Sequence, residues 1–317
     1  MAFNAPAGHL TLIDVARSDN EAAGELLVEA ATAAPEIGVF GADPIPGTKY
    51  SANVVVELPG AGIRNVNEGR ELTKGKTVRR DHTTQVVNPE WAVEQSVGRE
   101  HAGGIADLMD REAGLHTMGA MIDLGQRCFY DAPKGTDAKI TGLIHQMSPQ
   151  LVVDAGGPKG EALTSIFFCK VGRYGARFVV GFNGEWSISE QRTQVEIDHN
   201  DGSRKTVVSQ EMMARVGFVL ESQKSVCRIA NINLNADPGQ PGHLTDALIR
   251  KAIGMMPQMF KPDVAFLRDE AGGQIATHRE GRSTSVGYAS NPEDLGVAAA
   301  IYTESLKVNE AHVAVAA

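Results

Sequence analysis

A long charged segment with few apolar residues interrupts the first third of this sequence. Residues 64 to 87 read RNVNEGRELTKGKTVRRDHTTQVV. YSANVVVELPGAG, which precedes this segment, and TVRRDHTTQVV, which ends it, have the β-branched enrichment of strands. The pattern predicts a long, exposed hairpin. Because two strands alone are only marginally stable in water, such a hairpin needs a partner surface to lie on.

The rest of the chain predicts a mixture of helices and strands. A capped helical pattern spans residues 10 to 34, and the glycines and prolines that follow it predict an arm reaching away from the main body. Apolar residues at three- and four-residue steps predict one helix from about 98 to 126, about 40 Å long. Beyond residue 132 the pattern alternates strands with one short helix. Residues 272 to 296 are predicted to be a loop rich in Gly and Ser, with strands after it.

Several classes of site are disfavoured by residue type and spacing. Cys128, Cys169 and Cys227 are far apart and have apolar neighbours, so buried thiols are expected rather than a disulfide or a metal site. The nine histidines show no HExxH or HxH spacing, so no zinc site is predicted. The net charge of −9 argues against a dedicated nucleic-acid binder, whose affinity would come from clustered Lys and Arg.

Membrane insertion and secretion are also disfavoured. The longest apolar runs fall far short of the roughly 18 residues that a membrane helix needs. The first twenty residues lack a basic region before an apolar core, so no secretory signal is predicted and the protein is expected to start in the cytosol.

No catalytic residue or cofactor is predicted, and the chain is expected not to be an enzyme. LVVDAGGPKGEALTS suggests a phosphate loop, but Lys159 precedes Gly160, and Glu161 stands where the lysine is needed, which favours a plain turn. EIGVFGADPIPG lacks the strand and helix of a dinucleotide fingerprint. The carboxylates at 107 to 123 are more typical of a solvated helix face than of acid–base catalysis.

Four stretches together resemble the major capsid proteins of tailed bacteriophages, with the Hong Kong ninety-seven-type capsid fold. VNEGRELTKGKTVRRDHTTQVV is similar to the extended-loop ribbon of one capsid subfamily, and TSIFFCKVGRYGARFVVGF to the strand pair that opens the axial domain. GFVLESQKSVCRIANINL resembles the strand passage back to the peripheral domain. LTDALIRKAIGMMPQMFKPDVAFL resembles the helix and strand that follow. Residues 272 to 287 depart from the family pattern.

This resemblance implies an α+β fold with the family's parts in order. Residues 1 to 47 would be an N-terminal arm, and residues 48 to 96 an extended loop with its stems. Residues 97 to 131 would hold the spine helix of the peripheral domain. Residues 132 to 295 would mostly form the axial domain, and residues 296 to 317 would return as strands to the peripheral domain.

The same resemblance implies a major capsid protein that self-assembles into the icosahedral head of a tailed bacteriophage around double-stranded DNA. Its partners would be itself, in pentamers and hexamers, with scaffolding, decoration and portal proteins and non-specific contact with DNA, but no membrane. Assembly in the bacterial cytoplasm and a place in the virion are expected. An encapsulin-like shell that encloses an enzyme is an alternative. A cytosolic α/β enzyme that binds a phosphorylated metabolite is another.

The charged hairpin is the candidate site. Opposite charges interleaved along an extended ribbon can pair with the charges of a neighbouring subunit and fix its register. A mobile surface loop is the alternative, and composition does not separate the two. The candidate contact residues are Arg64, Glu68, Arg70, Glu71, Lys74, Lys76, Arg79 and Arg80.

Overall fold

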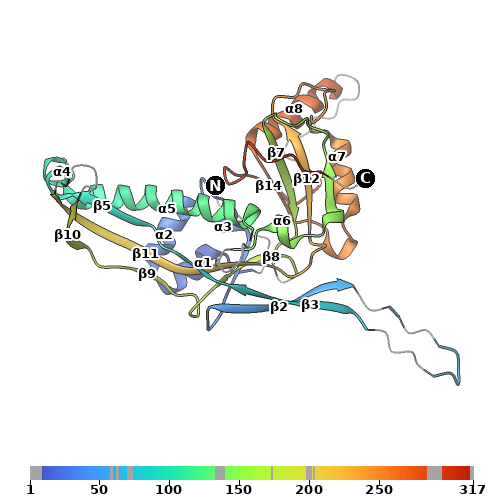
Figure 1. Ribbon diagram of the computed structural model, residues 1–317, viewed down its shortest axis with the longest axis horizontal. Coiled ribbons are helices and arrows are strands. Elements are labelled where there is room, and N and C mark those ends of the chain that lie inside the picture. The colour runs from blue at the N-terminus through green and yellow to red at the C-terminus, as the bar shows by residue number, and fades with distance from the viewer. Residues whose placement is uncertain are drawn as a thin grey trace.

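The structure is a computed structural model of the chain. It describes residues 9–57, 60–61, 64–69, 74–132, 140–172, 174–197, 202, 204–283 and 295–314. Two sheets with their helices make up the body, and a two-stranded ribbon projects from it (Figure 1). None of the described helices is long and apolar enough to cross a membrane.

The N-terminal segment is part of the body. A capping box between Thr11 and Asp14 starts α1 (Leu12–Asp19), and the side chain of Asn20 caps α2 (Glu21–Ala30). After α3 (Glu36–Val39), β1 (Gly41–Pro44) pairs in parallel with β8 (Ala176–Val180). Leu12, Leu27 and Ile37 are fully buried in the main core. The expectation of an arm reaching away from the body is therefore wrong for the described residues from 9 onward.

The seven-stranded sheet is built around β11 (Arg204–Leu220). Its main path is β1-β8-β11-β10, with β10 at Arg192–Ile197. β4 (Gln85–Val87), β5 (Glu90–Glu94) and β9 (Trp186–Ile188) also pair with β11. The long helix α5 (Gly104–Tyr130) runs along β5, as Figure 1 shows.

The long helix differs from its predicted bounds at both ends. α4 (Gln95–Glu100) is a separate short helix, and α5 begins only at Gly104, whose φ of +76° is a left-handed conformation that glycine adopts at little cost. The other end of α5 extends past residue 126 to Tyr130. The predicted periodicity was therefore correct, but the start of the helix is set by a backbone break that the apolar pattern does not report.

The five-stranded sheet has the order β14-β13-β7-β12-β6. β7 (Leu163–Cys169), β12 (Val226–Asn233) and β13 (Val264–Leu267) are buried along their whole length, and β6 (Val152–Asp154) and β14 (Ala299–Tyr302) lie at the edges. Three further helices are α6 (Leu143–Gln146), α7 (Asp246–Met255), which packs on β12, and α8 (Asp269–Ser283).

Two expectations for the C-terminal part are wrong. The predicted loop at 272 to 296 is helical as far as Ser283, because α8 buries Ala271 and Ile275 against the body. The predicted return strands reduce to β14, which joins the five-stranded sheet rather than the sheet beside α5. Residues 303–314 form no strand. Instead, a buried ion pair between Arg228 and Glu310 fixes this segment to β12, with the guanidinium Nη2 and carboxylate Oε2 2.6 Å apart.

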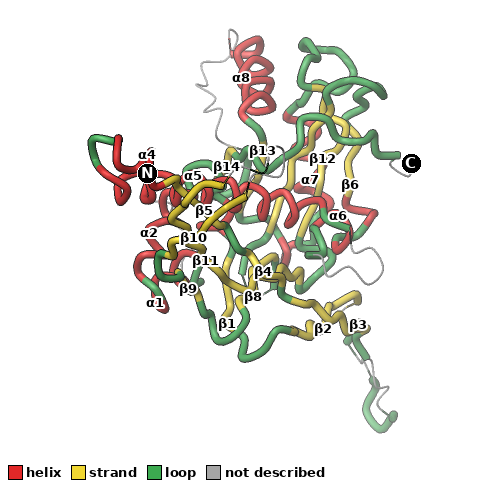
Figure 2. Tube along the Cα trace, turned by 60° about the vertical axis from the view of Figure 1, so that its left-hand side comes forward, coloured by secondary structure: helices red, strands yellow, loops and turns green. Residues whose placement is uncertain are grey.

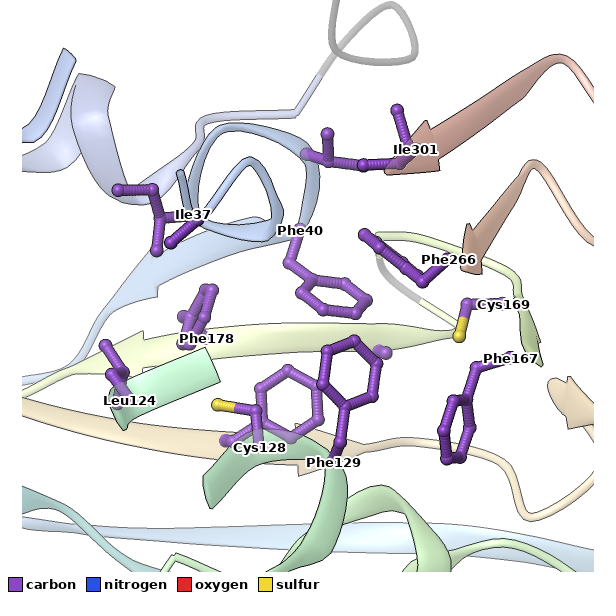
Figure 3. Packing of buried hydrophobic residues seen from close by; sticks show 14 of the residues in the cluster. Ile37, Phe40, Leu124, Cys128, Phe129, Phe167, Cys169, Phe178, Phe266 and Ile301 are labelled. Atoms are coloured by element: carbon purple, nitrogen blue, oxygen red, sulfur yellow. The ribbon is translucent and has the colours of Figure 1, made fainter. Parts of the chain in front are cut away.

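An aromatic cluster joins the two sheets into one core. Phe40 follows α3, and its ring lies 5.9 Å from that of Phe178 in the seven-stranded sheet and 4.8 Å from that of Phe266 in the five-stranded sheet. Phe129 of α5 lies 5.5 Å from Phe266 and 5.1 Å from Phe167 (Figure 3). Because these rings interdigitate, the sheets cannot turn relative to each other without losing buried aromatic contacts.

The three cysteines are buried thiols, as the sequence predicted. All three are free and fully buried. Burial raises the pKa of each thiol, which keeps it protonated and unreactive.

A buried carboxyl joins the first and last parts of the chain. Thr303 and Ser305 donate hydrogen bonds through their hydroxyls to the carboxyl oxygens of Glu36, which is fully buried. A Cβ at Gly125 would collide with this carboxyl and with Ser305, so the close approach of α5 requires glycine there. Burial raises the pKa of Glu36, although both hydroxyl bonds oppose the shift.

We expect Glu36 to make stability depend on pH. Its folded pKa lies above the ordinary 4.5, so its contribution is fully present below that pH and is lost as the pH rises toward the folded pKa. Glu36→Gln keeps the shape and cannot ionise. It should be no less stable than wild type at pH 7 and should lose less stability between about pH 5 and about pH 8, as measured by urea unfolding. An unchanged pH dependence would contradict this role for Glu36.

Candidate intersubunit ribbon

The ribbon consists of β2 (Lys49–Glu57), β3 (Lys76–Thr83) and the chain between them. The two strands pair only with each other, antiparallel, from Lys49 opposite Thr83 to Glu57 opposite Lys76. In both views the ribbon extends away from the body (Figures 1 and 2). The hairpin predicted from the charge pattern is therefore present in the described residues.

The tip of the ribbon is a polar turn with one exposed apolar side chain. Asn67 has a φ of 71°, a left-handed conformation that asparagine tolerates better than most residues. The amide of Asn65 donates to a carboxylate oxygen of Glu68 over 3.3 Å, and Arg64 donates to the Glu68 carbonyl over 3.4 Å. Val66 is 91% exposed, more than any other large hydrophobic residue described.

A small apolar patch attaches the root of the ribbon to the body. Ala52 and Val54 of β2 are buried against Ile45, Val179 and Val219. The two strand residues are two positions apart and therefore point to the same side of the ribbon. The expectation of a nearly coreless hairpin consequently holds for the outer ribbon but not for its root.

A charged cluster lies beside this patch. The Arg177 guanidinium pairs with the carboxylates of Asp43 and Glu221 and donates to the Tyr50 hydroxyl over 2.5 Å. Tyr50 in turn donates to Glu221 over 3.0 Å. Burial raises the pKa of Tyr50, with the nearby Arg177 charge opposing the shift, so the phenol remains a neutral donor. The cluster ties β1, β2, β8 and the end of β11 together at the root.

The other root strand carries a buried histidine. His82 of β3 is buried, and its Nε2 has no hydrogen-bond partner among the described residues. Loss of water on burial, helped by the Arg80 charge, lowers the pKa of His82 to about 4. Arg80 itself is half-buried and donates to the Gln146 carbonyl over 3.3 Å.

The structure places six of the eight predicted contact residues. Arg79 and Arg80 lie at the root and already have partners within the chain, since Arg79 donates to Asp81 over 3.3 Å and to Ser51 over 2.9 Å. Within the subunit both charges therefore already have partners, and their contact with a neighbouring subunit stays a prediction. Lys74 and Lys76 are exposed and have no ion-pair partner within the part of the chain described. Arg64 and Glu68 lie at the tip, as described above. Arg70 and Glu71 lie outside the described residues.

Sequence reasoning missed the residues that hold the root. Tyr50, Arg177 and Glu221 are more than forty residues apart along the chain, and no local spacing connects them. His82 lies within the quoted charged segment, but its burial depends on the body beneath it. Val66, at the tip, was also missed, although an apolar residue in a charged turn is a signal that the sequence offers.

The alternative sites have no support in the structure. The GGPKGE segment joins β6 to β7, so a strand follows it where a phosphate loop needs a helix N-terminus. Within the described ranges, no group of three or more His, Cys, Asp and Glu side chains could hold a metal ion.

Comparison with known families gives one match over most of the chain. A family model described as "Major capsid protein GP7" matches residues 25–271. Comparison with curated proteins gives no match.

Solved structures also match over most of the chain. The structure of bacteriophage Epsilon15 is 16% identical, covers 86% of this chain and 88% of its own, and has a TM-score of 0.59, which shows a shared fold. The bacteriophage JBD30 capsid is 9% identical over 87% of this chain and 92% of its own, with a TM-score of 0.47. The SrpI encapsulin complex from Synechococcus elongatus is 11% identical over 65% and 89%, with a TM-score of 0.42.

We expect His82 to loosen the ribbon root in acid. Its folded pKa of about 4 lies below the ordinary 6.5, so the unfolded chain binds a proton first, and stability falls as the pH drops from 6.5 to about 4. His82→Phe should reduce this loss, which is at most about 3 kcal/mol. Hydrogen exchange of the β2 and β3 amides across this pH range measures it. The exposed His145→Phe is the matched control, and equal curves for the two variants would contradict the role of His82.

Proposed function

This chain belongs to the major capsid protein GP7 family, and on that premise we propose that its ribbon is a contact by which one shell subunit lies on the next. The protein is a shell-forming capsid protein with the fold of tailed-phage capsid subunits. The partner of the ribbon is then another copy of the same chain.

The observation that carries this proposal is the contrast between the root and the outer ribbon. The root is fixed by buried apolar contacts and by the Arg177 cluster. Beyond it, Val66, Lys74 and Lys76 are exposed. A mobile loop needs no such anchored base. A ribbon held firmly at one end and exposed at the other can present the same surface to every neighbour.

Shell geometry explains why an extended contact suits this role. Subunits in rings of five and six meet at slightly different angles, so each contact must tolerate some variation. A ribbon lying across a neighbour supplies area without requiring one rigid interface. Weak contacts repeated over many subunits add up to a stable shell.

We extend the proposal to the rest of the particle. The shell encloses double-stranded DNA in the virion of a tailed bacteriophage and is assembled in the host cytoplasm, with scaffolding, decoration and portal proteins as further partners. The net charge of −9 supports DNA as cargo, because an acidic inner wall would not hold phosphates tightly. Shells that protect DNA from nuclease would support this cargo, whereas shells that retain a protein instead would favour an encapsulin-like compartment.

We also propose how the family's parts map onto this chain. Residues 48 to 96 are the extended loop with its stems, and α5 is the spine helix of the peripheral domain. The seven-stranded sheet beside α5 belongs to that domain, so residues 176–220 are peripheral rather than axial. The five-stranded sheet is the core of the axial domain.

Shortening the ribbon tests its role. Replacing residues 67–76 by a short Gly-Ser turn removes the turn at Asn67 and the exposed Lys74 and Lys76 but keeps Ala52 and Val54 at the root. We expect circular dichroism and subunit melting to stay nearly unchanged, while electron microscopy shows no shells or irregular ones. Unfolding of the subunit would mean that the outer ribbon belongs to the core. Normal shells would mean that it is a mobile surface loop.

A second variant separates charge from length. Lys74→Glu with Lys76→Glu keeps the ribbon intact and should give a milder assembly defect. That defect should depend on salt, because screening acts over about 8 to 10 Å at physiological ionic strength. Arg250→Glu with Lys251→Glu, at exposed positions of α7, changes the net charge by the same amount and is the control.

A further inference from the structure

β10 is an edge strand with an open side. It pairs with β11 along its whole length, from Arg192 opposite Ser209 to Ile197 opposite Arg204, and no described strand pairs with its other edge. All six of its residues are exposed. Figure 1 shows β10 at the margin of the molecule, at the end away from the ribbon tip.

One face of β10 continues a buried apolar surface. Val208 of β11 pairs with Val93 of β5 on one side and with Thr193 on the other, so these three side chains share the face that α5 covers. Val195 and Ile197 lie on the same face but outside the helix cover, and they are 61% and 49% exposed. The opposite face of β10 carries Arg192, Gln194 and Glu196.

The free edge of β10 is protected only by the charges of Arg192 and Glu196. Proteins commonly block exposed edges with proline, lysine, a bulge or a covering segment. Between Arg192 and Ile197 there is no proline or lysine, and the register against β11 has no shift. An unpaired backbone beside exposed Val195 and Ile197 is a template for another strand.

The sequence of β10 is complementary to itself in one register. In an antiparallel pair centred on Gln194, Arg192 faces Glu196 of the second copy at both ends, and Thr193 faces Val195. Centring the pair on Thr193 leaves Arg192 opposite Gln194, and centring it on Val195 moves the facing carboxylate to Asp198, beyond the end of β10. Shifting the pairing of the two β10 strands by a single residue would place polar side chains of one copy on the same face as apolar side chains of the other. Arg192 has no ion-pair partner among the residues described, whereas Glu196 lies 3.1 Å from Lys205.

We propose that β10 pairs with β10 of a second copy, antiparallel and centred on Gln194, as a two-fold contact between shell subunits. Such a contact is isologous and therefore closes on two subunits. The inference rests on the chain being a shell subunit, but not on the ribbon contact. Six residues of strand are a small interface, so the pair should be weak between free subunits and become effective where a shell holds the two strands close together.

A self-crosslink tests the register directly. In the proposed pair Gln194 lies opposite its own copy, at a Cα separation that suits a disulfide. The native cysteines are buried and give little background. We expect mild oxidation of Gln194→Cys shells to convert most subunits to a reducible dimer. Glu190→Cys is the matched control, because its exposed position would lie about 26 Å from its copy. Equal dimer yields from the two variants would overturn the proposal.

A charge exchange tests the pairing itself. In the Gln194→Cys background, Arg192→Glu places like charges opposite each other and should lower the dimer yield several-fold, while the Glu196–Lys205 pair stays intact. Adding Glu196→Arg together with Lys205→Glu restores complementarity between the two copies, keeps opposite charges facing each other between β10 and β11, and should restore the yield. Failure of this variant to recover, with normal circular dichroism, would overturn the register. Because the ribbon is intact in all these shells, a negative result here is distinct from failure of the ribbon variants.

Discussion

The aromatic cluster around Phe40 is the contact on which the rest of the molecule depends. Its rings come from both sheets, from α5 and from the segment after α3, so one packed core fixes the two sheets relative to each other. The ribbon leaves one end of this body, and β10 lies at the other. Their separation is therefore a property of the core. A subunit that must repeat many times in a shell needs that constancy.

Features that depend on local pattern could be predicted from the sequence. The charge run predicted the ribbon, apolar periodicity predicted most of α5, and the apolar flanks of the cysteines predicted buried thiols. Features that depend on distant partners could not. Glycines and prolines made residues 35 to 47 look loose, although Ile37 and Phe40 are buried in the main core. α8 carries a Gly-Gly pair, yet Gln274 anchors it by bonding to the backbone of Leu244 and Asn233.

The same distinction applies to the candidate site. The exposed residues of the ribbon belong to one continuous segment and could be predicted from the sequence, whereas the residues that anchor its root are brought together by the fold. Arg177, Tyr50 and Glu221 meet only because β1, β2, β8 and β11 converge at the root. Arg79 and Arg80 looked like the other ribbon charges in the sequence, but they also make hydrogen bonds within the chain that no local pattern reports.

A ribbon fixed only at its root behaves mechanically as a cantilever. From the anchored Val54 to Glu57 at the end of β2 the strand extends about 10 Å at about 3.3 Å per residue, so a rotation of about 5° at the root displaces Glu57 by roughly 0.9 Å. Farther along the ribbon the displacement grows in proportion to the distance from the root. Differences in curvature between positions in a closed particle can be absorbed by small elastic adjustments at the base, while the exposed outer residues of the ribbon keep their own geometry.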